Sequence, residues 1–395
     1  MPRLLFVAMP ESIHTARWIA QIAEQGWDIY LFPCYAAPMH PELRHLTAFA
    51  SAPPRRTDPK HHVRRLWWTL PFFLVDWVRS KLRRAPVSSM TSRALALAIR
   101  GLQPDIVHSL EIQHAGYLAL DARQRLRGRF PKWIVTNWGS DIYLFGRLPE
   151  HKARIRAVLA ACDYYSCECE RDVRLARESG FEGTVLPVLP NTGGFDLAWA
   201  AALQEPGPVS SRRTILLKGY QHWAGRALVG LEALRRCADL LQGYSLAISV
   251  ASPEVRIAAE LFRQDTGIPV QILEAVSHEE MLRTYGRSRL YLGLSISDAI
   301  STSLLEAMVM GAFPIQSCTA CADEWIEDGR SGLVVPPEDP AAVAEAVRRG
   351  LADDDLVDRA AQINASVARA RLDRSILGPR VIQMYADILG TGRTS

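Results

Sequence analysis

Short apolar runs alternate with amphipathic stretches along the first half of the chain. The runs predict buried strands, and the stretches between them have the spacing of apolar residues that is typical of helices. The predicted strands are 4–9, 28–33, 105–108 and 132–136. The predicted helices are 14–25, which stops at Gly26, and 115–126. Strands that alternate with helices in this order indicate a parallel sheet covered by helices on both faces.

The same alternation restarts after residue 210. Strands are expected at 214–217, 245–250, 270–273 and 290–294. Helices are expected at 227–236, 253–266 and 278–288, from about residue 304, after Asp339-Pro340 and at 376–389. Proline at the first position of a helix, as in Asp339-Pro340, is a common way for a helix to begin.

A segment rich in Pro, Gly and Ser, residues 189–213, separates the two halves. We therefore expect an α/β protein with Rossmann-like, doubly wound domains at 1–195 and 210–375, facing a central cleft. Residues 376–395 are expected to form a C-terminal helix and tail that pack back towards the first domain. Ligands of such sheets bind outside the carboxyl ends of the strands.

Composition narrows the class of protein. Apolar residues make up 48% of the 395 residues and charged residues 22%, which is a globular balance. The apolar run 4–9 is too short for a signal peptide, and no stretch is long enough to span a bilayer, so a cytoplasmic protein is expected. Seven scattered cysteines indicate reduced thiols. The Cys318-x-x-Cys321 pair lacks further ligands at zinc spacing, and Asp353–Asp355 is interpreted as a solvated helix cap, so no metal or cofactor is expected.

Charge is unevenly distributed. Residues 1–100 carry fourteen Lys or Arg against six Asp or Glu, although the whole chain has a net charge of only +4. Within them, residues 64–84 place Trp and Phe side chains between Arg and Lys residues, a pattern typical of peripheral binding at the inner face of an anionic membrane. The alternative is a core helix with snorkelling basic ends. No nucleic-acid-binding module accompanies the charge, so nucleic acid is not expected as a partner.

The segment 295–315 carries the strongest chemical pattern. A polar loop follows a strand and leads into a helix expected to open at Ser303, and the amino end of a helix is a favourable site for a diphosphate. Asp298 lies in the loop and Glu306 in the helix, eight residues apart. Two structural interpretations stay open: Ser303-x-x-Glu306 also fits a capping box, and Asp298 also fits a turn residue.

This segment resembles the Glu-x7-Glu motif of the retaining family 4 glycosyltransferases, which have the GT-B fold. Residues 324–347 also match that family. The resemblance implies that Asp298, one methylene shorter than the usual acid, approaches the donor sugar, and that Glu306 hydrogen-bonds the nucleotide ribose. It implies a donor site of Lys218, Gly219, Arg226, Ser301, Thr302, Ser303, Leu304 and Glu306.

Two cations of this site follow the first strand of the second half. Lys218 and Arg226 lie in a strand-to-helix loop, where positive charge stabilises a departing diphosphate. The family usually has Arg before Lys at a shorter spacing, so the correspondence is inexact. Ordinary surface charge is the alternative for both residues.

The resemblance is weaker in the first half. Ser12, His14 and Thr15 lie in a loop expected to face the cleft, and many relatives carry His where Trp138 stands. With that His replaced, Asp141 or His114 is left to orient donor or acceptor, beside Asp298 as the third predicted catalytic residue. Each of Asp141 and His114 also fits a capping or buried polar group.

The resemblance implies that the first domain binds the acceptor and the second the donor. We expect retaining transfer of a hexose-type sugar from a UDP- or GDP-sugar to a hydroxyl of a glycan or lipid-linked acceptor, in cell-surface polysaccharide or glycolipid synthesis. Two alternatives stay open. A nucleotide-sugar epimerase on the same fold would need no acceptor, and a non-catalytic sugar- or lipid-binding scaffold would turn over no donor.

Overall fold

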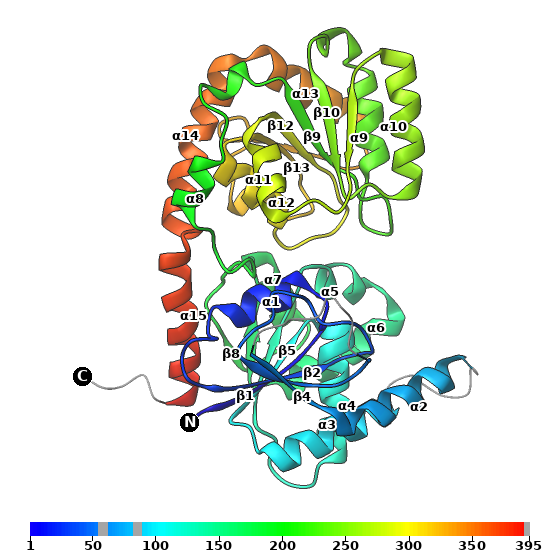
Figure 1. Ribbon diagram of the computed structural model, residues 1–395, viewed down its shortest axis with the longest axis vertical. Helices are drawn as coiled ribbons and strands as arrows, with labels where there is room; N and C mark the ends of the chain where they lie inside the picture. The colour runs from blue at the N-terminus through cyan, green and yellow to red at the C-terminus, as the bar shows by residue number, and fades with distance from the viewer. Residues whose placement is uncertain (54–61, 82–88, 391–395) are drawn as a thin grey trace. The chain divides into compact units, whose positions relative to one another are not determined.

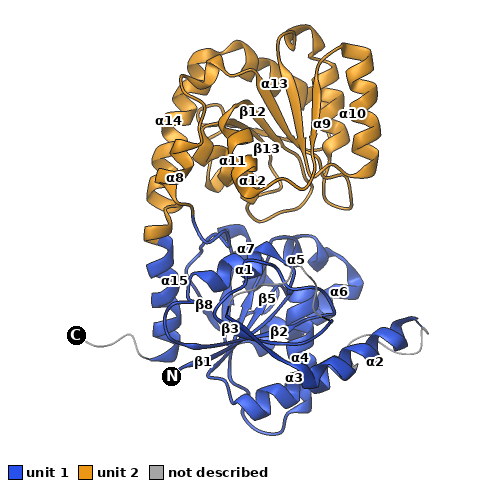
Figure 2. Ribbon diagram, in the orientation of Figure 1, with its two compact units in different colours: residues 1–194, 377–395 blue, residues 195–376 orange. Residues whose placement is uncertain are grey.

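A computed structural model describes residues 1–53, 62–81 and 89–390. The chain divides into two compact units, one of residues 1–194 with 377–395 and one of residues 195–376 (Figures 1 and 2). Each unit is built on a parallel sheet with helices on both faces, which confirms the expected fold class.

The sheet of the first unit has the strand order β4-β3-β2-β1-β5-β6-β7-β8 among the described residues. Its strands are β1 (Arg3–Ala8), β2 (Asp28–Pro33), β3 (Leu46–Phe49), β4 (Val63–Leu66), β5 (Ile106–Leu110), β6 (Lys132–Thr136), β7 (Tyr164–Ser166) and β8 (Thr184–Val185). The strand order reverses between β1 and β5, so the loops after these strands diverge at the edge where such sheets bind ligands.

Alternate residues of the central strands face two separate cores. Leu5 and Val7 of β1 pack with helices on one face, and Leu4 and Phe6 pack with helices on the other. The helices of this unit are α1 (Ile13–Ala20), η1 (Trp67–Thr69), α2 (Leu70–Lys81), α3 (Ser89–Leu102), the π-helix η2 (Ile112–Gly116), α4 (Tyr117–Arg125), α5 (Ser140–Tyr143), η3 (Phe145–Arg147), α6 (Pro149–Ala161) and α7 (Glu170–Glu178).

The last helix, α15 (Arg374–Leu389), packs onto the first unit as the sequence predicts. Its Tyr385 hydroxyl accepts a hydrogen bond from Trp18 Nε1 at 2.8 Å and lies 2.6 Å from His108 Nδ1. The other ring nitrogen of His108 lies 2.6 Å from Thr136 Oγ1. This buried chain of polar groups ties α15 to α1, β5 and β6.

The second unit has the strand order β11-β10-β9-β12-β13-β14 among its residues. Its strands are β9 (Thr214–Lys218), β10 (Ser245–Ser249), β11 (Val270–Leu273), β12 (Ser288–Gly293), β13 (Phe313–Ser317) and β14 (Leu333–Val335). Its helices are α8 (Leu197–Ala202), η4 (Val209–Ser211), α9 (Ala227–Arg235), η5 (Ala238–Leu240), α10 (Pro253–Thr266), α11 (His278–Gly286), α12 (Thr302–Met310), η6 (Ala322–Glu324), α13 (Pro340–Ala352) and α14 (Asp354–Arg371).

Two of the predicted helices end at least two residues earlier than expected. The helix predicted at 14–25 ends at Ala20, and turns follow it. The helix predicted at 278–288 ends at Gly286 because Ser288 already pairs in β12. Asp339 caps α13 with Pro340 at its first position, as predicted, and Asp353 caps the 18-residue α14, a helix that the sequence analysis did not identify.

Candidate functional site

The carboxyl end of β9 brings a lysine next to the loop after β12. Lys218 Nζ donates a hydrogen bond to Ser301 Oγ at 3.1 Å and lies 3.9 Å from Asp298 Oδ2. Burial alone lowers the pKa of Lys218, but Asp298, two tyrosines and Glu306 offset that effect, so its pKa is raised above the ordinary value. Lys218 is therefore a charged ammonium with only 16% of its side chain exposed.

Asp298 is a turn residue of the loop after β12, and its carboxylate also approaches Lys218. Its Oδ1 accepts a hydrogen bond from the Ala299 backbone N–H at 3.0 Å, as a turn residue would. Its Oδ2 is the atom nearest Lys218. The loop thus holds the carboxylate in place and directs one oxygen towards the ammonium group.

Helix α12 begins at Thr302, with Ser301 as its N-cap residue. The first turn of a helix carries backbone N–H groups that lack partners within the helix, and the helix dipole adds positive charge there. The Lys218 ammonium lies against this turn through its bond to Ser301. Positive charge from two sources therefore meets at one point, which suits a diphosphate.

Glu306 is buried one turn further along α12, with 6% of the residue exposed. The capping-box interpretation is wrong, because the N-cap is Ser301 and Ser303 already lies inside the helix. The Glu306 carboxylate instead lies 3.0 Å from Nε2 of His278, the first residue of α11. His278 was not predicted, because nothing in the spacing of 28 residues links it to Glu306.

Gly219 and Arg226 flank the loop that follows β9. The Gly219 N–H donates to the Ser249 carbonyl at 2.7 Å, and a Cβ at this position would lie 2.7 Å from Ile248 Cγ2. Glycine thus lets the chain pass close to β10. The Arg226 guanidinium pairs with Glu338 at 2.9 Å and donates to two carbonyls of its own loop, so it braces that loop.

In the first unit, Asp141 links the loops that follow β5 and β6. Its Oδ2 accepts hydrogen bonds from the backbone N–H groups of Ile112 at 2.9 Å and Trp138 at 3.0 Å. Burial, reinforced by the nearby Glu111 carboxylate, raises the pKa of Asp141 well above its usual value. With 4% of the residue exposed, its visible task is to hold these two loops together.

Of the three residues predicted in a loop after β1, Ser12 precedes the helix, whereas His14 and Thr15 lie in α1 itself. Ser12 Oγ caps α1 by accepting the His14 N–H at 3.2 Å, and Thr15 is buried. The His14 ring packs edge-on against Trp138, with centroids 5.5 Å apart. His14 and Trp138 are thus brought together, while Ser12 and Thr15 serve the helix itself.

His114 lies on the π-helix η2, directly after β5. Its Nδ1 is 3.2 Å from Oε2 of Glu111, and 55% of its side chain is exposed. Glu111 was missed by the sequence analysis. What distinguishes Glu111 is its backbone φ of +85°. The sequence does not reveal this conformation, because the residue is not glycine.

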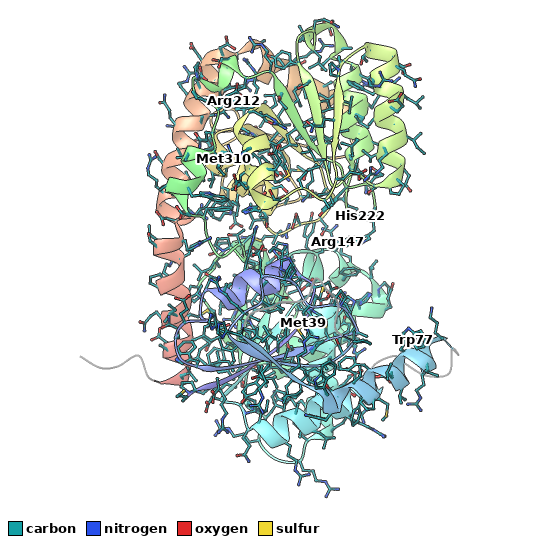
Figure 3. The ribbon with its side chains drawn as sticks, in the orientation of Figure 1. Met39, Trp77, Arg147, Arg212, His222 and Met310 are labelled. Carbon is teal, nitrogen blue, oxygen red and sulfur yellow. The ribbon has the colours of Figure 1, made fainter. Side chains whose placement is uncertain are left out.

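In the described part of the aromatic and basic segment, residues 64–81, several apolar side chains are exposed. On η1 and α2, Trp67, Trp68, Leu74, Val75, Trp77 and Val78 are each at least 41% exposed. Figure 3 shows Trp77 on α2, which projects from the first unit. Phe73 is buried in the core, and Asp76 accepts hydrogen bonds from the Thr91 N–H and hydroxyl at the start of α3. Arg83 and Arg84 of this segment lie outside the described residues.

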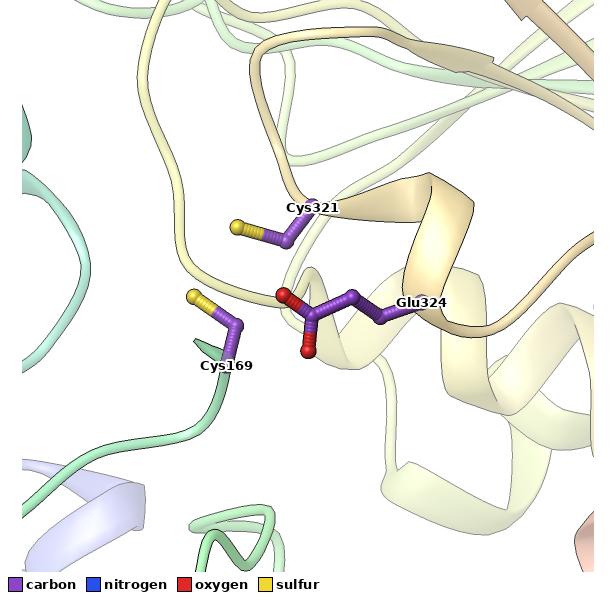
Figure 4. Close-up of side chains that lie close together, drawn as sticks. All are labelled: Cys169, Cys321 and Glu324. Carbon is purple, nitrogen blue, oxygen red and sulfur yellow. The ribbon is translucent and has the colours of Figure 1, made fainter. Parts of the chain in front are cut away.

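The cysteines carry free thiols. Cys318 is exposed, whereas Cys321 is buried and begins η6 in a left-handed conformation. Figure 4 shows the Cys321 and Glu324 side chains, which lie at opposite ends of η6. The Glu324 N–H donates to the Cys321 carbonyl at 3.2 Å. No helix among the described residues is both long and apolar enough to cross a bilayer.

Each unit matches a known family. Residues 72–166 match the model described as glycosyl transferase 4-like, and residues 228–353 match the model described as glycosyl transferases group 1. An alpha-D-kanosaminyltransferase of Streptomyces kanamyceticus is 29% identical over 119 residues, which are 30% of this chain and 31% of that protein. The alignment thus spans about a third of that relative's length.

Solved structures share the fold over nearly the whole chain. Sucrose-phosphate synthase from Thermosynechococcus elongatus superimposes with a TM-score of 0.71 at 17% identity, over 99% of this chain and 100% of that chain. Anabaena HepE in complex with UDP-glucose gives a TM-score of 0.67 at 12% identity, over 98% and 100%. A glycosyltransferase family model matches part of each unit, and the GT-B fold extends over nearly the whole chain, so the chain resembles the family 4 glycosyltransferases.

Proposed function

We propose that the protein transfers a hexose-type sugar, with retention of anomeric configuration, from a UDP- or GDP-sugar to an acceptor hydroxyl. The observation that carries the proposal is the cluster of Lys218, Asp298 and Ser301 at the amino end of α12, with the buried Glu306 beside it. UDP-glucose bound to Anabaena HepE supports a nucleotide-sugar donor, because HepE shares the fold. In this proposal the second unit binds the donor and the first unit the acceptor.

The proposed mechanism is mainly electrostatic. Lys218 and the first-turn amides of α12 stabilise the negative charge that develops on the departing diphosphate. Asp298 holds the sugar, and Glu306, oriented by His278, binds the ribose. These groups are already fixed by the loops that carry them, so little reorganisation is needed when charge develops. A role in cell-surface polysaccharide or glycolipid synthesis follows if the acceptor is glycan or lipid-linked.

A ligand screen tests the donor site. UDP, GDP, CMP and their sugars are added separately, and the ligand that binds the native state raises the melting temperature. We expect a shift with UDP or GDP that shrinks in Asp298→Asn and Glu306→Gln. Glu260→Gln, an exposed carboxylate change on α10, is the matched control. If Asp298→Asn and Glu306→Gln both leave nucleotide binding and donor turnover unchanged, the assignment of the donor site is refuted.

Product analysis tests the reaction. The donor is incubated alone and with an acceptor panel, and anomeric configuration is read by NMR. Transfer with retention is expected only when acceptor is present. An epimerised donor formed without acceptor would identify an epimerase, and no turnover despite nucleotide binding would identify a scaffold.

We also propose that α2 binds an anionic membrane surface. Its exposed apolar side chains adjoin Arg64, Arg65, Arg79 and Lys81, a combination that favours the boundary of anionic headgroups. Phe73 and Asp76 anchor the helix to the unit, which leaves the opposite side free for lipid.

Flotation with vesicles containing phosphatidylserine tests the membrane proposal. Replacing Trp67, Trp68 and Phe72 with Ser should reduce co-flotation, and high salt should weaken it further. Trp199→Ser, at a tryptophan of similar exposure in the second unit, is the control. Equal flotation of the triple variant and the unmodified protein would overturn the proposal.

A further inference from the structure

The turn after β5 contains a strained glutamate. Glu111 has φ +85° and ψ 148°, a region of backbone space that is essentially restricted to glycine. The next five residues form the π-helix η2, a form that is rare and frequent at functional sites. Such strain persists only where the surroundings enforce it, and it concentrates where ligands are bound.

The hydrogen bonds of Glu111 explain how the conformation is held. Its Oε1 accepts the Gln113 N–H at 2.6 Å, and its Oε2 accepts the His114 N–H at 2.7 Å. The same Oε2 lies 3.2 Å from His114 Nδ1. The carboxylate therefore fixes the backbone of η2 and the imidazole that η2 carries.

Fixing Nδ1 determines what His114 presents. A proton on Nδ1 shared with the Glu111 carboxylate makes the opposite nitrogen, Nε2, a hydrogen-bond acceptor in the neutral ring. The side chain is 55% exposed, and the Tyr35 ring packs edge-on against it with centroids 5.4 Å apart. The imidazole is thus accessible and held on two sides.

The charges around the ring select the ligand. Glu11, which accepts a hydrogen bond from the Tyr35 hydroxyl at 2.5 Å, Glu111 and Asp141 all lie near His114 and raise its pKa. The hydrogen bond from Glu111 is the largest contribution to that rise, and burial opposes it. Acidic groups on several sides disfavour a phosphate or carboxylate at this position.

We propose that His114 Nε2 binds a hydroxyl of a neutral sugar acceptor, and that Glu111 is the positioning residue that holds His114 for it. The inference rests on the proposed function and assigns the acceptor class to a place in the first unit. It also explains why a non-glycine residue is retained at a glycine-like conformation, since glycine would relax the strain and lose the carboxylate.

Variants of both residues test the proposal. In the unmodified protein, transfer to methyl glucoside should exceed transfer to glucuronic acid. His114→Ala should lower kcat/KM for methyl glucoside roughly five- to tenfold through the acceptor KM, as expected for one lost hydrogen bond. Glu111→Gly should lower it similarly while keeping the melting temperature. UDP affinity should be unchanged in both, and His45→Ala, an exposed histidine of the same unit, is the control.

The pH profile separates binding by Nε2 from a merely structural role. In the unmodified protein, kcat/KM for methyl glucoside should rise with pH through an ionisation above 6.5, and His114→Gln should retain partial activity without that ionisation. An unchanged acceptor KM in His114→Ala, or an unchanged pH profile of kcat/KM in His114→Gln, would overturn this inference and leave the proposed function intact. No transfer to any sugar by the unmodified protein would instead contradict the proposed function.

Discussion

Replacing Lys218 with Met isolates the diphosphate contribution to donor binding. Methionine keeps a side chain of similar length and removes the ammonium group. In the structure that group meets Ser301 Oγ at 3.1 Å and Asp298 Oδ2 at 3.9 Å. The distance to Asp298 is long for an ion pair, so the loss within the free protein should be modest compared with the loss of a bound phosphate.

The expected magnitude follows from one charge-assisted contact. A hydrogen bond to a charged group contributes about 1.5–3 kcal/mol. Since about 1.4 kcal/mol corresponds to a tenfold change in affinity, the Kd for UDP should rise roughly 10- to 100-fold. Uridine has no phosphate, so its affinity should stay within about twofold.

Titration calorimetry with UDP and uridine measures both affinities, and GDP with guanosine replaces them if GDP is the nucleotide bound. Lys152→Met, which changes an exposed lysine of α6, controls for general charge effects. A loss of UDP affinity matched by an equal loss for uridine would show that the variant distorts the site as a whole. An unchanged UDP affinity would refute the phosphate role of Lys218 outright.

Three further substitutions test buried contacts inside each of the two units. Asp76→Asn should lower the free energy of unfolding by about 1–3 kcal/mol, measured by urea, because Thr91 and the start of α3 lose a buried carboxylate partner. Burial lowers the pKa of His108 to about 3, so the unfolded state, with a pKa of about 6.5, takes up a proton that the native state refuses. Stability should therefore fall by up to about 1.4 kcal/mol per pH unit below 6.5, with a shallower slope in His108→Gln. Gly219→Ala should destabilise by about 1–3 kcal/mol because its Cβ would meet atoms at 2.7–2.8 Å, whereas Gly101→Ala, in open space on α3, should be neutral or stabilising by thermal melting.

Where the sequence predicts a strand, its bounds agree with the structure more closely than those of the predicted helices do. The ranges 28–33, 132–136 and 270–273 agree with β2, β6 and β11 residue for residue, because turn-forming residues bound short apolar runs. The strands β3, β4, β7, β8, β13 and β14 were not predicted. β4 consists of Val63–Leu66 with two arginines, so its pairing with β3 has no hydrophobic pattern to reveal it.

The candidate site likewise contains residues that the sequence predicted and residues that it did not. Asp298 and Glu306 were predicted because a motif fixes their spacing along the chain, and Lys218 was predicted from its place after the first strand of the second half. The structure brings Lys218 to Asp298. His278 was missed because its partner Glu306 is 28 residues away and the contact exists only once α11 packs beside α12. A sequence motif identifies candidate binding residues more readily than the residues that hold them in place.

Glu111 and Glu306 show why the structure is needed to separate a capping role from a functional one. Both carboxylates lie near a helix start, where a capping role is the ordinary expectation. Glu111 does cap η2, yet it does so at a backbone cost that an ordinary cap residue would not incur, and it also holds His114. Glu306 lies too far into α12 to cap it and pairs with His278 instead. In both cases a buried carboxylate contacts an imidazole at the carboxyl edge of its sheet: Glu111 holds His114, and His278 holds Glu306. Substitution of either acid should therefore affect ligand binding more than helix stability.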